Sequence, residues 1–293
     1  MRNNIKPSDF DEKLKHSIDL LKKAERLALN YSNKGFCLAF SGGKDSQALY
    51  HVSKLAEVRF EAHYHITTLD PPELVHFIKD NYPDVILDRP ALTFSDLCIK
   101  KKILPTRLMR FCCAALKESH GGGSVTLTGI RKKESVKRSR RNEMEISGRK
   151  FSGTQQQFDQ FTREKEVEGV QCIKGKDRII INPIIEWAEN DVWYFLNNIV
   201  KVKHCKLYDE GWSRIGCLFC PMSSKANISR DCQKYPKYKA MLIRTIHRIR
   251  ESGGLYKFPD LTDEEYFNWW ISKETLKKWY FGNKQQQNLF NKK

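Results

Sequence analysis

A glycine-containing hexapeptide, Ser-Gly-Gly-Lys-Asp-Ser at residues 41–46, lies directly between a short apolar run and a helical pattern. The apolar run at residues 37–40 is typical of a buried strand. Apolar residues then recur at helical spacing from Ala48 to Leu55. The hexapeptide is therefore expected on a strand-to-helix turn.

This position suits an anion, because the first amides of a helix lack intrahelical partners and carry the positive end of the helix dipole. Gly42 and Gly43 allow a tight turn and a close approach of the backbone to a ligand. Lys44 adds a positive charge, while Ser41 and Ser46 add hydroxyl donors. We expect a phosphate or pyrophosphate here, and the alternative is a glycine turn with an N-capping residue. The G-x-x-x-x-G-K-[ST] spacing of a Walker A loop is absent.

The charge of the chain points to anionic partners. Its 293 residues include 52 Lys and Arg against 35 Asp and Glu, a net charge of +17. Such a field attracts polyanions and nucleotides, so DNA or RNA is one expected partner, with general solubility as the alternative explanation. No apolar run reaches the roughly 20 residues that cross a bilayer, and the first residues lack the apolar core of a signal peptide. We therefore expect a cytoplasmic protein without membrane association.

Strand and helix patterns alternate along most of the chain. Helices are expected over residues 10–31, after the hexapeptide and from Pro71, and strands around residues 59–70, 84–90, 125–130 and 178–182. This alternation predicts βαβ units, and hence an open, doubly wound α/β fold with a mostly parallel sheet and a nucleotide at the carboxyl ends of its strands. Residues 131–175 are rich in charge and poor in apolar residues, which predicts a mobile loop or an excursion of the chain over the site. Amphipathic helices are expected from about Tyr235 onward.

Several motifs together resemble a known family. "SGGKDS" resembles the PP-loop of the adenine nucleotide α-hydrolase superfamily, whose members bind ATP or adenylyl sulfonucleotides. From about residue 34 to residue 222, the chain resembles the phosphoadenosine phosphosulfate (PAPS) reductase family, through "RFCCAALKE", "TGIRKKESVKR", "INPIIEWAENDVW" and "LYDEGWSRIGCLFCP" in that order. The expected organisation is therefore a helical segment (1–33), a nucleotide-binding domain (34–222) and a C-terminal helical extension (223–293).

The resemblance implies an adenine nucleotide, ATP or a sulfonucleotide such as PAPS or adenylyl sulfate, with Mg²⁺ as a candidate companion. The implied nucleotide-binding residues are Ser41, Gly42, Gly43, Lys44, Asp45, Ser46, Gly129, Arg131 and Arg138. Lys44 and Asp45 are also the candidate catalytic residues. The two arginines suit this role because a guanidinium can donate two hydrogen bonds to one oxyanion. A solvated basic loop is the alternative for the arginine segment.

Nine cysteines in a chain without a signal peptide favour metal binding over a disulfide framework. Cys112 and Cys113 are adjacent, and Cys217 and Cys220 form a C-x-x-C pair. The set resembles the ligands of the [4Fe-4S] adenylyl-sulfate reductases and related DNA-thiolating proteins, which implies such a cluster here. Zinc is the less favoured alternative. The structural alternative is two buried neutral cysteines beside an unrelated C-x-x-C.

One departure from the family leaves the function open. Its sulfonucleotide reductases use a nucleophilic cysteine in a C-terminal Glu-Cys-Gly-(Leu/Ile)-His segment, and no cysteine follows Cys232 here. The favoured function is ATP-dependent sulfur transfer onto nucleic acid. The second is sulfonucleotide reduction with Cys205 or Cys232 as the nucleophile, and the third is a non-catalytic nucleotide-sensing or DNA-binding role in a mobile-element or defence system. A cysteine desulfurase or a thiol reductant protein is the expected protein partner of the first two.

Overall fold

The computed structural model describes residues 6–117, 123–146, 179–255 and 260–282. The chain forms two compact units, each built from separate stretches of sequence. Unit 1 comprises Met1–His65, Pro72–Asp88 and Ser119–Ile215, and unit 2 comprises Ile66–Pro71, Arg89–Glu118 and Gly216–Lys293. The domain boundaries expected after residues 33 and 222 stay predictions.

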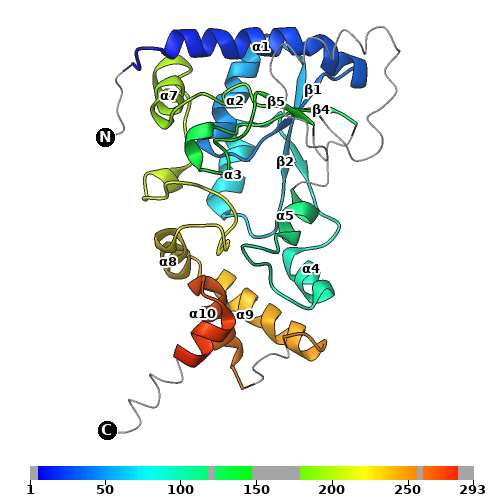
Figure 1. Ribbon diagram of the computed structural model, residues 1–293, viewed down its shortest axis with the longest axis vertical. Coiled ribbons are helices and arrows are strands. Elements are labelled where there is room, and N and C mark those ends of the chain that lie inside the picture. Colours follow the sequence, from blue (N-terminus) through cyan, green and yellow to red (C-terminus); the bar gives the residue numbers. More distant parts are fainter. Residues whose placement is uncertain (1–5, 118–122, 147–178, 256–259, 283–293) are drawn as a thin grey trace. The chain divides into compact units, whose positions relative to one another are not determined.

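A six-stranded sheet lies at the centre of the described part of unit 1 (Figure 1). Its strands are β1 (Phe36–Ala39), β2 (Phe60–His65), β3 (Ile86–Asp88), β4 (Val125–Leu127), β5 (Met144–Ile146) and β6 (Ile179–Ile181), in the order β3-β2-β1-β4-β6-β5. Neighbouring strands are parallel except for the antiparallel pair β5–β6. The direction of winding reverses between β1 and β4, the type of switch point at which doubly wound sheets bind ligands. The predicted α/β fold is confirmed.

The prediction of a loop over residues 131–175 was wrong at Met144–Ile146, which forms β5. This short strand pairs with β6, so its backbone groups find partners that the local charge density did not suggest. Residues 147–175 of the predicted loop lie outside the described residues.

The helices of unit 1 surround this sheet. They are α1 (Phe10–Tyr31), α2 (Lys44–Leu55), α3 (Pro72–Asn81) and α7 (Glu189–Tyr194), which continues as the π-helical turn η2 (Phe195–Ile199); η1 (Lys132–Glu134) and η3 (Lys206–Tyr208) are short 3₁₀ turns. The ring of Phe40, which follows β1, packs edge-on against Tyr50 of α2 and also contacts Tyr82, which follows α3. These contacts place α2 and α3 on the same face of the sheet. The N-terminal helix has the bounds expected from the sequence.

Unit 2 is helical in its described part. Its helices are α4 (Phe94–Lys101), α5 (Phe111–Leu116), α8 (Lys225–Lys234), α9 (Pro236–Glu251) and α10 (Asp263–Ser272). α9 packs against α4, α8 and α10, and it buries Leu242, Ile246 and Ile249 completely. The expected amphipathic C-terminal helices are confirmed, and Trp270 belongs to their core. Among the described helices, none combines the length and apolar character needed to cross a bilayer.

Candidate active site

The hexapeptide forms the turn between β1 and α2, and the Ser46 hydroxyl closes it. Ser46 Oγ accepts the backbone N–H of Ser41 at 3.1 Å and the Ser41 hydroxyl at 3.0 Å, and it donates to the Gly43 carbonyl at 2.9 Å. Ser46, 5% exposed, therefore braces the loop. The sequence led us to expect a ligand donor at Ser46, and its binding to phosphate stays a prediction.

Two positions require glycine, because neighbouring atoms lie too close to leave room for a side chain. Gly42 has a φ of +68°, and a Cβ there would lie 2.7 Å from Leu74 Cδ1 and 2.8 Å from Ile78 Cδ1, both on α3. A Cβ on Gly129, just after β4, would lie 2.8 Å from the Asp45 carbonyl oxygen. Any side chain at Gly129 would push the end of β4 away from the start of α2. The two strands that flank the switch point thus meet at the hexapeptide.

Lys44 begins α2 and is buried, with 5% of its surface exposed. Its backbone N–H, one of the unpaired donors of a helix start, donates to the Tyr208 hydroxyl at 2.9 Å. Its Nζ donates to the Ser213 carbonyl at 3.3 Å and lies 3.5 Å from Glu189 Oε1. The Tyr208 hydroxyl thus accepts the hydrogen bond that we expect a bound anion to accept. The sequence patterns did not single out this residue.

Asp45 holds the arginine segment against the hexapeptide. Arg131, 3% exposed, donates from Nε to Asp45 Oδ1 at 2.7 Å. Glu134 forms an ion pair with Arg138, and its Oε1 lies 3.9 Å from Arg131 Nε. Both predicted arginines therefore lie beside carboxylates of unit 1. The sequence analysis did not assign Glu134 to this site.

The guanidinium groups near the hexapeptide also act on one another. Partial burial, followed by the nearby positive charge of Arg214, lowers the pKa of Arg138, and the charges of Arg141 and Arg131 add to the effect. Several cations held close together favour an added anion, because its charge offsets their repulsion. This electrostatic feature supports a phosphate ligand at the switch point.

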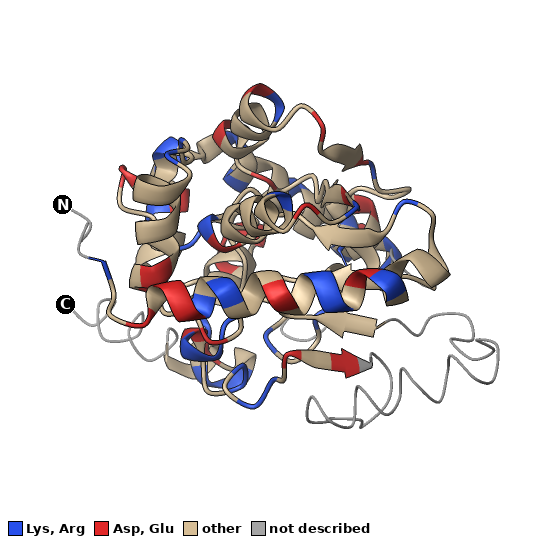
Figure 2. Cartoon of the chain, turned by 90° about the horizontal axis from the view of Figure 1, so that it is seen from above, with Lys and Arg blue, Asp and Glu red and all other residues tan. Residues whose placement is uncertain are grey.

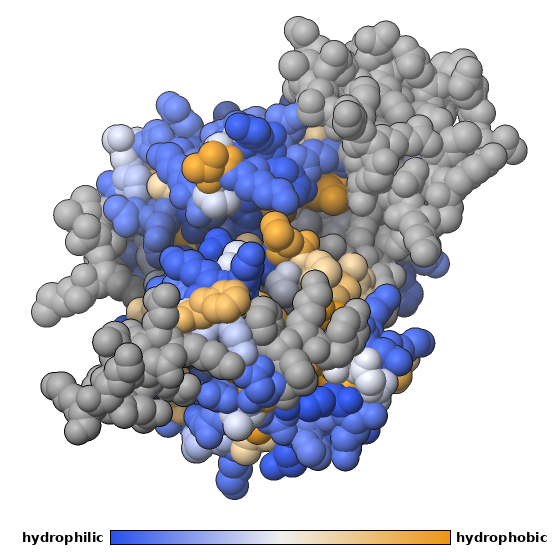
Figure 3. Space-filling view, turned by 60° about the horizontal axis from the view of Figure 1, so that its bottom comes forward, coloured by the Kyte–Doolittle hydropathy of each residue, from blue (hydrophilic) through white to orange (hydrophobic). Residues whose placement is uncertain are grey.

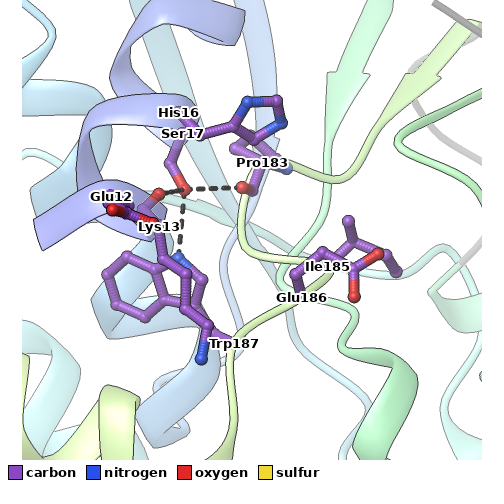
Figure 4. A pocket seen from close by; sticks show the side chains of 8 residues that line it. All are labelled: Glu12, Lys13, His16, Ser17, Pro183, Ile185, Glu186 and Trp187. Carbon is purple, nitrogen blue, oxygen red and sulfur yellow. Dashed lines mark hydrogen bonds between the residues drawn. The ribbon is translucent and has the colours of Figure 1, made fainter. Parts of the chain in front are cut away.

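A chain of hydrogen bonds connects α1 with Arg131, and Figure 4 shows the part of it around Ser17. Ser17 on α1 accepts the indole N–H of Trp187 at 3.1 Å and donates to the Pro183 carbonyl at 2.7 Å. Arg131 Nη1 in turn donates to the carbonyl of Trp187 at 3.4 Å. A cavity of about 230 Å³ lies along this contact, lined partly by Ser17, Pro183 and Trp187. Trp187 thus positions Arg131, a role that its place in an apolar run did not reveal.

The four predicted metal ligands gather in unit 2. The thiols of Cys112 and Cys113 share a hydrogen bond, which raises the pKa of Cys112, and the charges of Cys217 and Cys220 raise it further. That hydrogen bond lowers the pKa of Cys113, assisted by Arg110, whose Nη2 lies 3.4 Å from Cys113 Sγ. The structure therefore brings the CC pair and the C-x-x-C pair into one group.

Groups around the thiols stabilise negative charge. The pKa of Lys117 is raised, first by the charge of Cys217. Thiolates are the form in which cysteine binds metals, so these surroundings suit a ligand set.

The structure tests whether the thiols lie close enough together to hold a metal ion. Within residues 6–117, 123–146, 179–255 and 260–282, no three His, Cys, Asp or Glu side chains are grouped closely enough to hold a metal ion. Zinc takes four ligands at about 2.3 Å, which brings the sulfurs to within about 4 Å of one another. The described residues show no such arrangement, so a metal centre at this group, whether an iron–sulfur cluster or zinc, stays a prediction.

Comparison with known protein families identifies the domain that contains the switch point. The family model for the phosphoadenosine phosphosulfate reductase domain matches residues 35–223, more than half of the chain. The chain belongs to this family. Its sheet and hexapeptide therefore form a PAPS-reductase-like nucleotide-binding domain, and the ligand role of each named residue stays a prediction.

Two curated relatives in Methanocaldococcus jannaschii match most of the chain. The uncharacterized protein MJ0973 is 28% identical over 79% of this chain and 52% of its own length. The uncharacterized protein MJ0066 is 25% identical over 80% of this chain and 49% of its own length. The chain thus spans about half the length of these relatives.

Solved structures resemble this PAPS-reductase-family chain more distantly. Candida glabrata FMN adenylyltransferase in complex with FAD and inorganic pyrophosphate has a TM-score of 0.44 and 15% identity, covering 73% of this chain and 67% of that one. PAPS reductase from Candida auris, in a phosphate complex, has a TM-score of 0.43 and 15% identity, covering 73% and 96%. Likeness at this level assigns no substrate.

Proposed function

We propose that this PAPS-reductase-family chain uses ATP to activate an acceptor oxygen and then replaces that oxygen with sulfur, with nucleic acid as the acceptor. The observation that carries the proposal is the raised pKa of two thiols outside the four-cysteine group. Burial raises the pKa of Cys205 and of Cys232, the two expected substitute nucleophiles of a reductase. A sulfonucleotide reductase needs a reactive thiolate, and burial disfavours the thiolate form of both residues.

The chemistry requires two displacements. The acceptor oxygen attacks the α-phosphorus of ATP, and pyrophosphate leaves. A hydrosulfide sulfur then attacks the adenylated carbon, and AMP leaves with the oxygen. In this proposal the start of α2, Lys44 and Arg131, which donates to Asp45, bind the phosphates and stabilise their charge.

In this proposal Cys112, Cys113, Cys217 and Cys220 hold a [4Fe-4S] cluster. When bound, the cluster supplies iron that can hold sulfur for transfer. Arg110 and Lys117 offset the negative charge of the thiolates. The expected protein partner is a cysteine desulfurase or another supplier of sulfur.

The nucleic-acid partner is proposed for the basic segment at residues 131–141. Lys132 pairs with Glu186, and Arg141 pairs with Glu145, so part of its charge is used within the protein. Lys133, Lys137 and Arg140 are exposed and have no ion pair among the described residues. Helix α1 differs from this basic segment, because its acidic residues lie among its basic residues along the length of the helix (Figure 2). The three exposed cations are therefore the proposed phosphate contacts.

Turnover under anaerobic conditions tests the reaction. The protein is incubated with ATP, sulfide and nucleic acid, or with PAPS or adenylyl sulfate and a thiol reductant. We expect pyrophosphate and AMP from ATP, together with sulfur in the nucleic acid. Release of sulfite from a sulfonucleotide would establish the reductase instead, and nucleotide binding without any turnover would favour a sensing role.

A triple variant tests the acceptor surface: Lys133→Ala, Lys137→Ala and Arg140→Ala. Each lost phosphate contact should reduce the slope of log affinity against log salt by about 0.9 on duplex DNA. The matched control removes three exposed lysines of α1, at Lys15, Lys22 and Lys23. ATP affinity should stay unchanged in both variants. Equal loss of DNA binding in the two would indicate attraction by net charge rather than by this segment.

A further inference from the structure

A turn in unit 2 projects an apolar side chain into solvent just before the adjacent cysteines. The Thr106 N–H donates to the Met109 carbonyl at 3.1 Å, and the Met109 N–H donates to Thr106 Oγ1 at 3.1 Å. The base of the turn is fixed, because Trp270 Nε1 donates to the Pro105 carbonyl at 2.6 Å. At its tip Leu108 is 95% exposed. A rigidly supported turn thus presents a leucine with almost no contacts.

Further exposed apolar residues belong to the same region. Met109 is 47% exposed, and Met222, two residues after Cys220, is 46% exposed. Lys273 connects the two segments, since its Nζ donates to the Ser223 carbonyl and the charge of Arg107 lowers its pKa, after the larger effect of burial. We define the Leu108 surface as Leu108, Met109, Met222, Arg107, Arg110 and Lys273.

This composition is unusual for solvent-exposed surface. Figure 3 shows a face of the molecule on which the described surface is mainly hydrophilic, with several separate apolar patches. Single exposed apolar residues are normal in soluble proteins, whereas an apolar group with a polar rim marks an interaction site. The rim here is cationic, from Arg107, Arg110 and Lys273. Charge complementarity therefore calls for an acidic partner with an apolar centre.

The apolar residues of the Leu108 surface favour one of two classes of acidic partner, which are nucleic acids and proteins. Interfaces with nucleic acids are more polar than those with proteins, and single strands are held largely by stacking on aromatic rings. The Leu108 surface offers aliphatic leucine and methionine, and methionine is enriched at protein–protein interfaces. A protein partner fits this surface better.

We propose that the Leu108 surface docks an acidic protein partner beside the four-cysteine group. The location follows from Arg110, which belongs to the surface and whose Nη2 lies 3.4 Å from Cys113 Sγ. A partner seated on Leu108 therefore stands next to the thiols. The proposal does not depend on which reaction the nucleotide site performs.

Fluorescence anisotropy with a labelled peptide tests the docking surface directly. The probe carries glutamates on both sides of a central Leu-Phe pair, and a second peptide replaces that pair with Ser-Ser. The test variants are Leu108→Asp and Arg107→Glu. Their matched controls are Leu55→Asp, which is 46% exposed on α2, and Arg244→Glu, which is exposed on α9.

The unmodified protein should bind the Leu-Phe peptide more tightly than the Ser-Ser peptide. Leu108→Asp and Arg107→Glu should each weaken Leu-Phe binding at least about fivefold, the scale of a central interface residue, while both controls bind as the unmodified protein does. Iron content and ATP affinity should not change, which separates this test from that of the proposed function. Peptide binding that is absent, or equal in test and control variants, overturns the proposal. Loss of single-stranded DNA binding in Leu108→Asp, without any peptide binding, would assign the surface to nucleic acid.

Discussion

Lys44 combines burial, positive charge and a place at a helix start. Its Nζ lies near the Glu189 carboxylate at 3.5 Å and the Asp45 carboxylate at 3.9 Å, so its charge is already held in position before a nucleotide binds. A preorganised cation loses little freedom on meeting a phosphate. At the residue scale, this makes Lys44 the side chain from which we expect the largest single contribution to affinity.

Lys44→Ala should weaken ATP binding about 10- to 100-fold, because a hydrogen bond to a charged group contributes about 1.5–3 kcal/mol. Isothermal titration calorimetry measures the change. The matched control is Lys54→Ala near the end of the same helix, where the lysine pairs with Asp84 on the surface. Unchanged affinity in Lys44→Ala would remove the hexapeptide as the nucleotide site.

Tyr208 offers a second test at this scale, since its hydroxyl accepts the Lys44 N–H. Tyr208→Phe leaves that donor unpaired in the free protein and should cost about 1–3 kcal/mol of stability. A bound phosphate would supply a new acceptor, so ATP should raise the melting temperature more in Tyr208→Phe than in the unmodified protein. Differential scanning fluorimetry with and without ATP measures both values. An equal or smaller rise would show that the hydroxyl does not compete with the ligand.

At the scale of elements, the segment after β6 connects the N-terminal helix with the arginine segment. The Ile185 carbonyl accepts the Lys132 N–H at 2.8 Å, and the Trp187 carbonyl accepts from Arg131. Trp187 is 1% exposed, and its ring packs against Phe10 and Phe195. The helix α1 therefore supports the arginine segment through Trp187, without contributing a predicted ligand itself.

Ser17→Ala tests this support. It removes the acceptor of the Trp187 indole and the donor to Pro183, so it should cost about 1–3 kcal/mol in the free energy of unfolding. The control is Ser53→Ala on α2, another fully buried serine, whose hydroxyl bonds the Leu49 carbonyl in its own helix. Urea denaturation compares the two, and ATP affinity should fall in Ser17→Ala alone. Equal effects in the two variants would indicate a helix-local role for Ser17.

The elements show why sequence predicts one part of this molecule better than another. The strand, turn and helix around residues 36–55 were predictable because apolar periodicity and glycine placement are local signals. β5 was missed because its three residues gain their pairing from β6, which local composition does not report. Tyr208 and Glu134 were missed for a related reason, since tyrosine and glutamate are common and only tertiary contacts reveal their partners. All four predicted cysteines lie in unit 2, where they influence one another's pKa, but metal binding by them stays a prediction.

At the scale of the whole molecule, the proposed nucleotide site belongs to unit 1 and the four-cysteine group belongs to unit 2. The two can therefore be removed independently. Cys217→Ser with Cys220→Ser should abolish iron binding while leaving ATP affinity intact, as serine is a poor ligand for such clusters. Anaerobic purification with iron, zinc and sulfide analysis measures the first effect, and calorimetry measures the second.

The control for this variant is Cys37→Ser, which lies in β1 and outside the four-cysteine group. It should keep the full metal content. Full iron or zinc content in the double cysteine variant would contradict the proposed centre. Zinc in place of iron and sulfide would retain the ligand set and change the metal.

The interleaving of the two units has a consequence for biosynthesis. Unit 2 takes its segments from three separate places along the chain, and Cys217 emerges from the ribosome more than a hundred residues after Cys113. At ordinary rates of translation, roughly 5 to 20 residues per second, the first cysteine pair waits roughly 5 to 20 seconds for the second. During that interval the nascent chain exposes two adjacent thiols without their partners. Oxidants and free metal ions thus have a window of access to this pair that closes when the last third of the polypeptide folds.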